Sequence, residues 1–193
     1  MLHTKYFEVL KQFLGNYVAE IYGRMLVGKV PLSQKAIALA LAELEEKGVL
    51  RSRSQGMIKY YRLNLEHSEI KDVINMLEIE RKMEFLALHR KLAHMFREDA
   101  RVVGVFGSYA KNSQKEGSDV DVCIVGREKK GDYDKKGKLL DIDVSIKYFA
   151  PREWETLLSQ KNNLVKEIVS HHVMIFGVES FVNTLWRHFY GIN

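Results

Sequence analysis

The chain has 193 residues, of which 46% are hydrophobic and 28% are charged. This balance is typical of one or two globular domains, and it excludes a collagen, a disulfide scaffold and a disordered chain. The single cysteine, Cys123, cannot form an intrachain disulfide. The first residues lack the apolar block of a signal peptide, and no stretch approaches the roughly 18 apolar residues of a membrane span. Together these features predict a cytoplasmic protein.

The net charge of +5 is unevenly placed along the chain. Residues 1–65 contain 10 Lys+Arg and 5 Asp+Glu, whereas residues 66–193 contain 20 of each, so the whole excess lies in the first third. This asymmetry predicts two functional units, of which the first faces a polyanion.

Three helices are predicted in the first unit. Apolar residues recur at helical spacing over residues 6–14 and again over residues 18–27. The third helix has clear ends, because Ser33 is a good N-cap for the run 34–47 and Gly48 stops it.

A basic β-hairpin is predicted after the third helix, from the runs VLRSRS and MIKYYRL around Gln55-Gly56. Three helices and a basic hairpin form a winged helix-turn-helix, and the run LSQKAIALALAELEEKGVLRSRSQGMIKYYRLN resembles the winged-helix domains of small prokaryotic transcription regulators. The resemblance implies that Gln34, Lys35 and Ala38 face DNA base edges and that Arg51, Arg53 and Lys59 meet phosphates. The alternative is a domain that only mediates protein contacts.

A helical connector is predicted over residues 66–97, which lack Gly and Pro and carry apolar residues at three- and four-residue steps. It reads as one long helix or two abutting ones. Its apolar face is broad enough to pack on both domains or on a second copy of the chain, as in a homodimer. The predicted organisation is therefore an α+β chain with a winged helix-turn-helix at 1–65, a connector at 66–97 and a second domain at 98–193.

The strongest chemical signal starts in the second domain. A buried-strand pattern, RVVGVF, runs into Gly107-Ser108, where a glycine lets backbone N–H groups approach a phosphate at the start of a helix. Ten residues later, SDVDVCIVG predicts a strand with Asp119, Asp121 and Cys123 on one face. Two carboxylates on one face repel each other, so a shared divalent cation, Mg²⁺ or Mn²⁺, is the simplest explanation.

A neighbouring strand, LLDIDVSIKYF, offers a further carboxylate on a shared face, either Asp143 or its competitor Asp141. The intervening residues 127–138 are read as a flexible charged loop. Residues 151–193 are read as helical segments that cover one side of the sheet, and one of the adjacent His171 and His172 is expected to be buried and hydrogen-bonded.

Gly107-Ser108, ten intervening residues, Asp119-Val120-Asp121 and a later acidic residue together resemble the signature of the DNA polymerase β-like nucleotidyltransferases, specifically the minimal nucleotidyltransferases, over roughly residues 98–180. The resemblance implies a small mixed sheet flanked by helices, and transfer of a nucleoside monophosphate from an NTP to an acceptor hydroxyl. It implies that Asp119, Asp121 and Asp143 hold two metal ions and that Gly107 and Ser108 hold the β- and γ-phosphates.

The predicted function is an adenylyl- or nucleotidyltransferase that is coupled to DNA binding. The resemblance also implies a protein acceptor such as a HEPN-type toxin. A second hypothesis is a transcription regulator whose nucleotidyltransferase domain only senses nucleotide. A DNA-binding protein with an inactive domain is the weakest reading, because an inactive site does not need the carboxylates together with the Gly-Ser turn.

Overall fold

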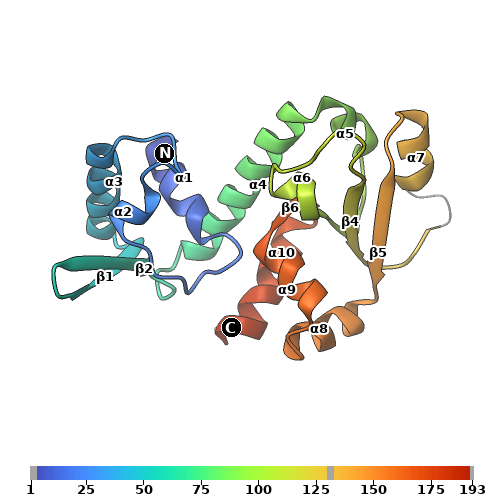
Figure 1. Cartoon of the computed structure of the whole chain (residues 1–193). Helices are drawn as coiled ribbons and strands as arrows, with labels where there is room; N and C mark the ends of the chain where they lie inside the picture. The colour runs from blue at the N-terminus through green and yellow to red at the C-terminus, as the bar shows by residue number, and fades with distance from the viewer. Residues whose placement is uncertain (1–3, 130–132, 192–193) are drawn as a thin grey trace. The chain divides into compact units, whose positions relative to one another are not determined.

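The computed structural model describes residues 4–129 and 133–191. It divides into two compact units, residues 1–77 and residues 78–193, coloured blue to cyan and green to red in Figure 1. The boundary lies inside the predicted connector. No helix among the described residues is both long and apolar enough to cross a membrane.

The first unit consists of short helices followed by a two-stranded hairpin. Its core is formed by apolar residues from the first helices and from α3, all at most 1% exposed: Val9, Leu10, Phe13, Ile37, Leu41 and Leu44. In chain order the elements are α1 (Thr4–Leu10), a 3₁₀ turn (Lys11–Phe13), α2 (Gly23–Leu26), α3 (Gln34–Glu46), β1 (Leu50–Gln55) and β2 (Ile58–Leu63).

The ends of α3 follow from local chemistry. The Ser33 side chain accepts a hydrogen bond from the backbone N–H of Ala36 at 3.2 Å, which caps the first turn. After the helix, Gly48 adopts a left-handed φ of +72°. The predicted third helix and its cap are therefore confirmed.

The predicted second helix is wrong over much of its length. Only Gly23–Leu26 is helical, and Ile21 instead forms a β-bridge with Tyr61 of β2. The backbone of these two residues exchanges hydrogen bonds of 2.9 and 2.7 Å. Pairing with a strand distant in sequence has overridden the local helical pattern. The hairpin itself is confirmed, with β1 and β2 antiparallel and Leu50 opposite Leu63.

The second unit is a four-stranded sheet with helices on both faces. The strand order is β5-β4-β3-β6, in which β3 is antiparallel to β4 and β6, and β4 is parallel to β5. This agrees with the small mixed sheet that the family resemblance implied. The elements are α4 (Ile70–Leu88), which starts in the first unit, α5 (Arg90–Met95), β3 (Val102–Phe106), α6 (Gly107–Ala110), β4 (Val120–Val125), α7 (Tyr133–Leu139), β5 (Val144–Phe149), α8 (Pro151–Ser159), α9 (Asn163–Ser170), β6 (His172–Phe176), α10 (Val178–Leu185) and a π-helical turn (Trp186–Tyr190).

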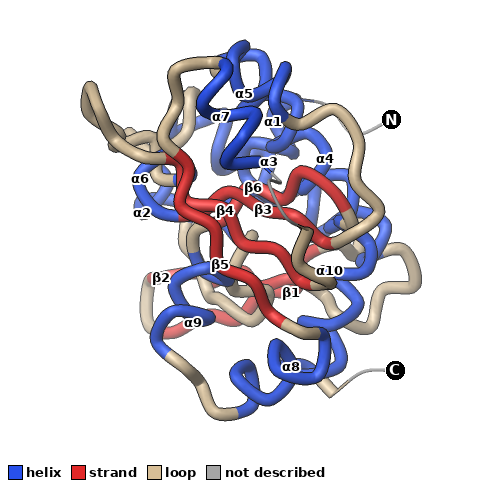
Figure 2. Tube along the Cα trace, turned by 90° about the vertical axis from the view of Figure 1, so that its right-hand side faces the viewer, coloured by secondary structure: helices blue, strands red, loops and turns tan. Residues whose placement is uncertain are grey.

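The two faces of this sheet have different covers. One face packs valines and isoleucines against residues of α4, α5 and α7, among them Phe85, Leu92 and Tyr133. The other face meets the C-terminal helices, where Phe149 contacts Trp154 with ring centroids 5.2 Å apart. Figure 2 shows α5 and α7 on one side of the red strands and α8 and α9 on the other.

Three predictions in this unit need correction. β5 starts at Val144, so neither Asp141 nor Asp143 lies on the strand as predicted. Asp141 lies in a turn with a φ of +56°. Part of the predicted flexible loop is helix α7, whose first residue, Tyr133, is buried at 1% exposure. Residues 130–132 of that loop lie outside the described residues. Within the predicted helical region, residues 172–176 form an edge strand on β3.

The buried histidine prediction is confirmed at His172. Its Nε2 lies 2.9 Å from Oε1 of Glu78 on α4, and both side chains have 0% exposure. Its Nδ1 lies 2.9 Å from the carbonyl oxygen of Val169, so Nδ1 must carry a proton that it donates. The contact between His172 and Glu78 joins α4 to the edge strand of the sheet.

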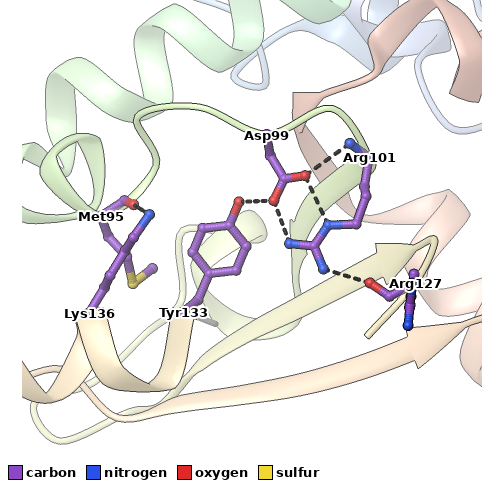
Figure 3. A network of polar contacts seen from close by, with 6 residues as sticks. All are labelled: Met95, Asp99, Arg101, Arg127, Tyr133 and Lys136. Carbon is purple, nitrogen blue, oxygen red and sulfur yellow. Dashed lines mark hydrogen bonds and ion pairs between the residues drawn. The ribbon is translucent and has the colours of Figure 1, made fainter. Parts of the chain in front are cut away.

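A second buried network joins α7 to the start of β3 (Figure 3). Asp99 accepts hydrogen bonds from the guanidinium and backbone N–H of Arg101 and, at 2.8 Å, from the hydroxyl of Tyr133. Arg101 also donates to the carbonyl of Arg127 at 3.0 Å. Burial raises the pKa of Asp99, but the hydrogen bonds from Arg101 and Tyr133 outweigh it and hold the pKa well below its ordinary value.

We expect Asp99→Asn to lower the free energy of unfolding by about 3 kcal/mol at neutral pH, because it leaves the buried guanidinium without its counter-charge. Tyr133→Phe removes one hydrogen bond to a charged group and should cost about 1.5 kcal/mol. Since the folded pKa is lowered, the contribution of Asp99 is present above its ordinary pKa of 3.8 and is lost as the pH falls below it. Urea titrations at neutral and acidic pH test this; equal stabilities of Asp99→Asn and wild type at neutral pH would contradict it.

Candidate active site

The Gly-Ser turn and the acidic strand meet because β3 and β4 are antiparallel. Phe106, the last residue of β3, pairs with Asp121 of β4, so the following residue, Gly107, lies against the Asp121 side chain. A Cβ atom at Gly107 would come within 2.3 Å of Asp121 Oδ2, and the φ of Gly107 is +69°. Only glycine can occupy this position without a shift of the carboxylate.

The predicted acidic residues occupy different places around this contact. Asp121 is partly buried on β4, whereas Asp119 is exposed in the loop just before it. Asp143 is exposed just before β5, and its carbonyl accepts a 2.8 Å hydrogen bond from the N–H of Val120. Asp119 and Asp143 thus each lie one residue before the start of a strand, β4 and β5 respectively, and these two strands are paired. The turn that contains Asp141 puts that residue outside this arrangement.

The environment of Asp121 disfavours its charge. Burial and then the charge of Asp119 raise the pKa of Asp121, and a hydrogen bond from the Ser145 hydroxyl opposes them only in part. Glu167 adds to the rise, and Lys147 counteracts it. A carboxylate in this setting is ready to gain a cation as a partner.

Two groups near Asp121 were not predicted as site residues. Glu167 lies on α9, and its Oε1 forms an ion pair with Nζ of Lys111 at 2.7 Å, so Lys111 is held by a partner rather than only solvated. Lys147 is exposed on β5 and lies opposite Cys123 of β4. Neither follows a motif in the sequence. The alternation of β5 could have indicated Lys147, two residues after Ser145, but only the fold brings α9 to this end of the sheet.

The donors present fit a magnesium or manganese ion that also binds substrate. Asp119 and Asp121 offer hard carboxylate oxygens at the end of the sheet where Gly107 leaves space. The described part of the chain contains no group of three or more His, Cys, Asp or Glu side chains assembled to hold a metal. Mg²⁺ is commonly held by one or two carboxylates together with substrate phosphates and water, so this pair is a sufficient protein contribution.

Cys123 lies on the same face of β4 as Asp121 but deeper in the sheet, and burial raises the pKa of its thiol to about 12. We therefore expect it to resist thiol reagents at pH 8 in the native protein and to react once the chain is unfolded in denaturant. Rapid labelling of the native protein, followed by mass spectrometry, would contradict this placement. The expected result agrees with a packing residue and not with a nucleophile.

The predicted phosphate-binding residues of the hairpin are all engaged by carboxylates. Arg51 pairs with Glu66, Arg53 donates two hydrogen bonds to Glu20 at 2.7 and 2.5 Å, and Lys59 lies 2.6 Å from Glu45. The hydrogen bonds from Lys59 and Ser52 lower the pKa of Glu45, and those from Arg53 lower the pKa of Glu20. The charge of this hairpin is thus largely balanced within the first unit.

The predicted base-contacting residues lie together. Gln34, Lys35 and Ala38 are all exposed on the first turns of α3, whereas Ile37 and Leu41 are buried. The structure therefore leaves this part of α3 accessible to a partner.

The family comparison concerns the second unit. Residues 87–176 match the family model described as a nucleotidyltransferase domain, a range that runs from the end of α4 to the end of β6 and contains the whole four-stranded sheet. Comparisons with curated proteins and with solved structures gave no match. The match agrees with the resemblance carried by Gly107-Ser108 and Asp119-Val120-Asp121. Residues 87–176 of this chain are therefore similar to nucleotidyltransferase domains.

Proposed function

We propose that the chain transfers a nucleoside monophosphate from an NTP, with ATP as the donor, to a hydroxyl group of a protein or small molecule, and that its N-terminal unit binds duplex DNA. The observation that carries the enzymatic part is the contact between Gly107 and Asp121. A left-handed turn is held against a partly buried carboxylate whose charge is disfavoured. This arrangement lowers stability, and such costs are concentrated at functional sites.

In the proposed reaction the acceptor hydroxyl attacks the α-phosphorus. A new P–O bond forms as the hydroxyl gives up its proton to water, the bond between the α-phosphorus and the oxygen that bridges to the β-phosphate breaks, and pyrophosphate leaves. Gly107 and Ser108 would hold the β- and γ-phosphates at the start of α6. Asp119 and Asp121 would hold a divalent cation, which would supply Lewis acidity and neutralise the developing charge, and Asp143 would join them once substrate is bound. Ser145 positions Asp121 through its hydrogen bond.

The DNA-binding part of the proposal is supported by the net positive charge of residues 1–65 and by the exposed first turns of α3. Three helices and an antiparallel hairpin are the elements of a winged helix-turn-helix, in which the third helix enters the major groove. A protein acceptor such as a HEPN-type toxin belongs to the same proposal, as does transfer coupled to occupancy of a DNA site.

Incubation of the full chain with Mg²⁺ and each α-labelled NTP in cell extract tests the enzymatic part. We expect labelled product and pyrophosphate from the wild type and neither from Asp119→Ala/Asp121→Ala. Lys135→Ala on the exposed side of α7 is a matched control that should keep activity. Nucleotide binding without pyrophosphate release in any extract would favour a domain that only senses nucleotide.

A further inference from the structure

The exposed face of α3 carries a stripe with little hydrogen-bonding capacity. Lys35, Ala38, Leu39 and Ala42 are spaced as i, i+3, i+4 and i+7, so they lie along one side of the helix, and all four are exposed. Leu39 is 52% exposed, although it is a large apolar side chain. Beyond its first turn, the next side chains on this face that could donate to or accept from a base edge are Glu43, which is paired with Lys5 and Tyr6, and Glu46.

Cations without an intramolecular partner gather at the N-terminal end of this stripe. Among the described residues, no ion pair is found for the exposed side chains of Arg24 on α2, Lys29 in the turn before α3, and Lys35. The hairpin cations Arg51, Arg53 and Lys59 are instead bound by carboxylates. One group of these cations therefore surrounds the turn between α2 and α3. Lys47 after α3 and Arg62 on β2 are also exposed and have no ion pair among the described residues.

The two observations together identify a partner. Free cations that flank the N-terminus of a helix suit a polyanion, because charge complementarity and the helix dipole both favour phosphate there. Alanines at 38 and 42 let a helix backbone approach a flat surface closely, whereas the cores of protein interfaces are rich in aromatic side chains. In the major groove the apolar group that such a face can contact is the C5-methyl group of thymine.

We propose that α3 recognises A·T-rich duplex DNA by packing Ala38, Leu39 and Ala42 on thymine methyl groups, while Arg24, Lys29 and Lys35 bind the flanking phosphates. The inference rests on the proposed DNA binding of the first unit and deepens it. It also reassigns the phosphate contacts, since the hairpin residues Arg51, Arg53 and Lys59 are predicted to stay paired with carboxylates.

Duplexes that differ only in the C5-methyl group provide the test of the base contacts. Binding of the full chain is measured by fluorescence anisotropy to an A·T-rich duplex, to the same duplex with uracil for thymine, and to a G·C-rich duplex with cytosine or 5-methylcytosine. We expect each buried methyl group to tighten binding by about fourfold. Leu39→Ser should reduce the ratio between thymine and uracil duplexes, whereas Leu39→Met should keep it, because methionine restores an apolar contact.

The dependence of affinity on salt tests the phosphate contacts. Arg24→Gln/Lys29→Gln should reduce the slope of log K against log salt by about two, at roughly 0.9 per lost phosphate contact. Glu20→Gln/Arg53→Gln is the matched control, because it removes an ion pair without a change in net charge and should leave the slope unchanged. A slope that falls in the control and not in the first variant would overturn the assignment of phosphate contacts.

The remaining outcomes separate the inference from the proposed function. Equal affinity for the thymine and uracil duplexes would overturn methyl recognition while DNA binding stands. No binding to any duplex at low salt would overturn both, and the transfer assay would still judge the enzymatic part independently. If Leu39→Ser instead changed the oligomeric state in sedimentation velocity, α3 would be a contact with a second copy of the chain, and the inference would be wrong.

Discussion

Asp121→Asn should reduce nucleotidyl transfer at least about 10²-fold without lowering the stability of the domain. The activity falls because the substitution removes a charged oxygen at the place where phosphate and cation are expected to meet. The free energy of unfolding should not fall, because the ionised carboxylate destabilises the folded state. Its pKa is raised by burial and by the charge of Asp119, so ionisation of Asp121 lowers the free energy of unfolding as the pH rises above its ordinary pKa of 3.8.

This combination separates a functional carboxylate from a structural one. Transfer of label and urea unfolding in metal-free buffer are measured on the same preparations. Asp99→Asn is the structural counterpart, because it removes a carboxylate that is already satisfied by Arg101 and Tyr133 and should lose stability. If Asp121→Asn were strongly destabilised while transfer per folded molecule stayed normal, Asp121 would be a structural residue and the proposed site would be wrong.

Gly107→Ala should also reduce transfer by about 10²-fold, here through geometry. A Cβ atom would lie 2.3 Å from Asp121 Oδ2, so either the turn or the carboxylate must move, and a displacement of about 1 Å at a reacting centre has an effect of this size. The left-handed backbone adds about 1–2 kcal/mol of destabilisation for any residue with a Cβ atom.

Gly191→Ala separates these two effects. Gly191 also has a left-handed φ, of +60°, but a Cβ atom at this position would meet no neighbouring atom of the described residues within 4 Å, so the substitution introduces backbone strain alone. We expect a similar loss of stability with unchanged transfer. Equal losses of transfer in both variants would mean that the effect of Gly107→Ala is a consequence of general destabilisation and not of the contact with Asp121.

The sequence alone was sufficient to predict the elements whose ends carry clear capping or turn residues. Ser33 and Gly48 delimit α3, and the alternating runs on either side of Gln55-Gly56 form the predicted hairpin. The spacing from Gly107 to Asp121 indicated a nucleotidyltransferase, and the family match over residues 87–176 agrees. These features depend on neighbours within about fifteen residues, which sequence patterns record directly.

Elements whose state depends on distant partners were predicted poorly. Residues 172–176 are a short apolar run that fits a helix or a strand by pattern, and only pairing with β3 makes them β6. Residues 18–22 have a helical pattern, yet Ile21 pairs with Tyr61. In each case the hydrogen bonds of a strand forty or more residues away outweigh a weak local preference.

The charges of the molecule show most clearly what the sequence determined and what was left to the tertiary structure. The sequence by itself determined that residues 1–65 carry the whole positive excess and that Asp119 and Asp121 stand two residues apart. Only the tertiary structure decided that Glu20 neutralises Arg53, that Glu167 holds Lys111, and that a turn removes Asp141 from the strand. The physical reason is that net charge and spacing are properties of the chain, whereas the energy of a charge depends on which groups the fold brings within a few ångströms of it.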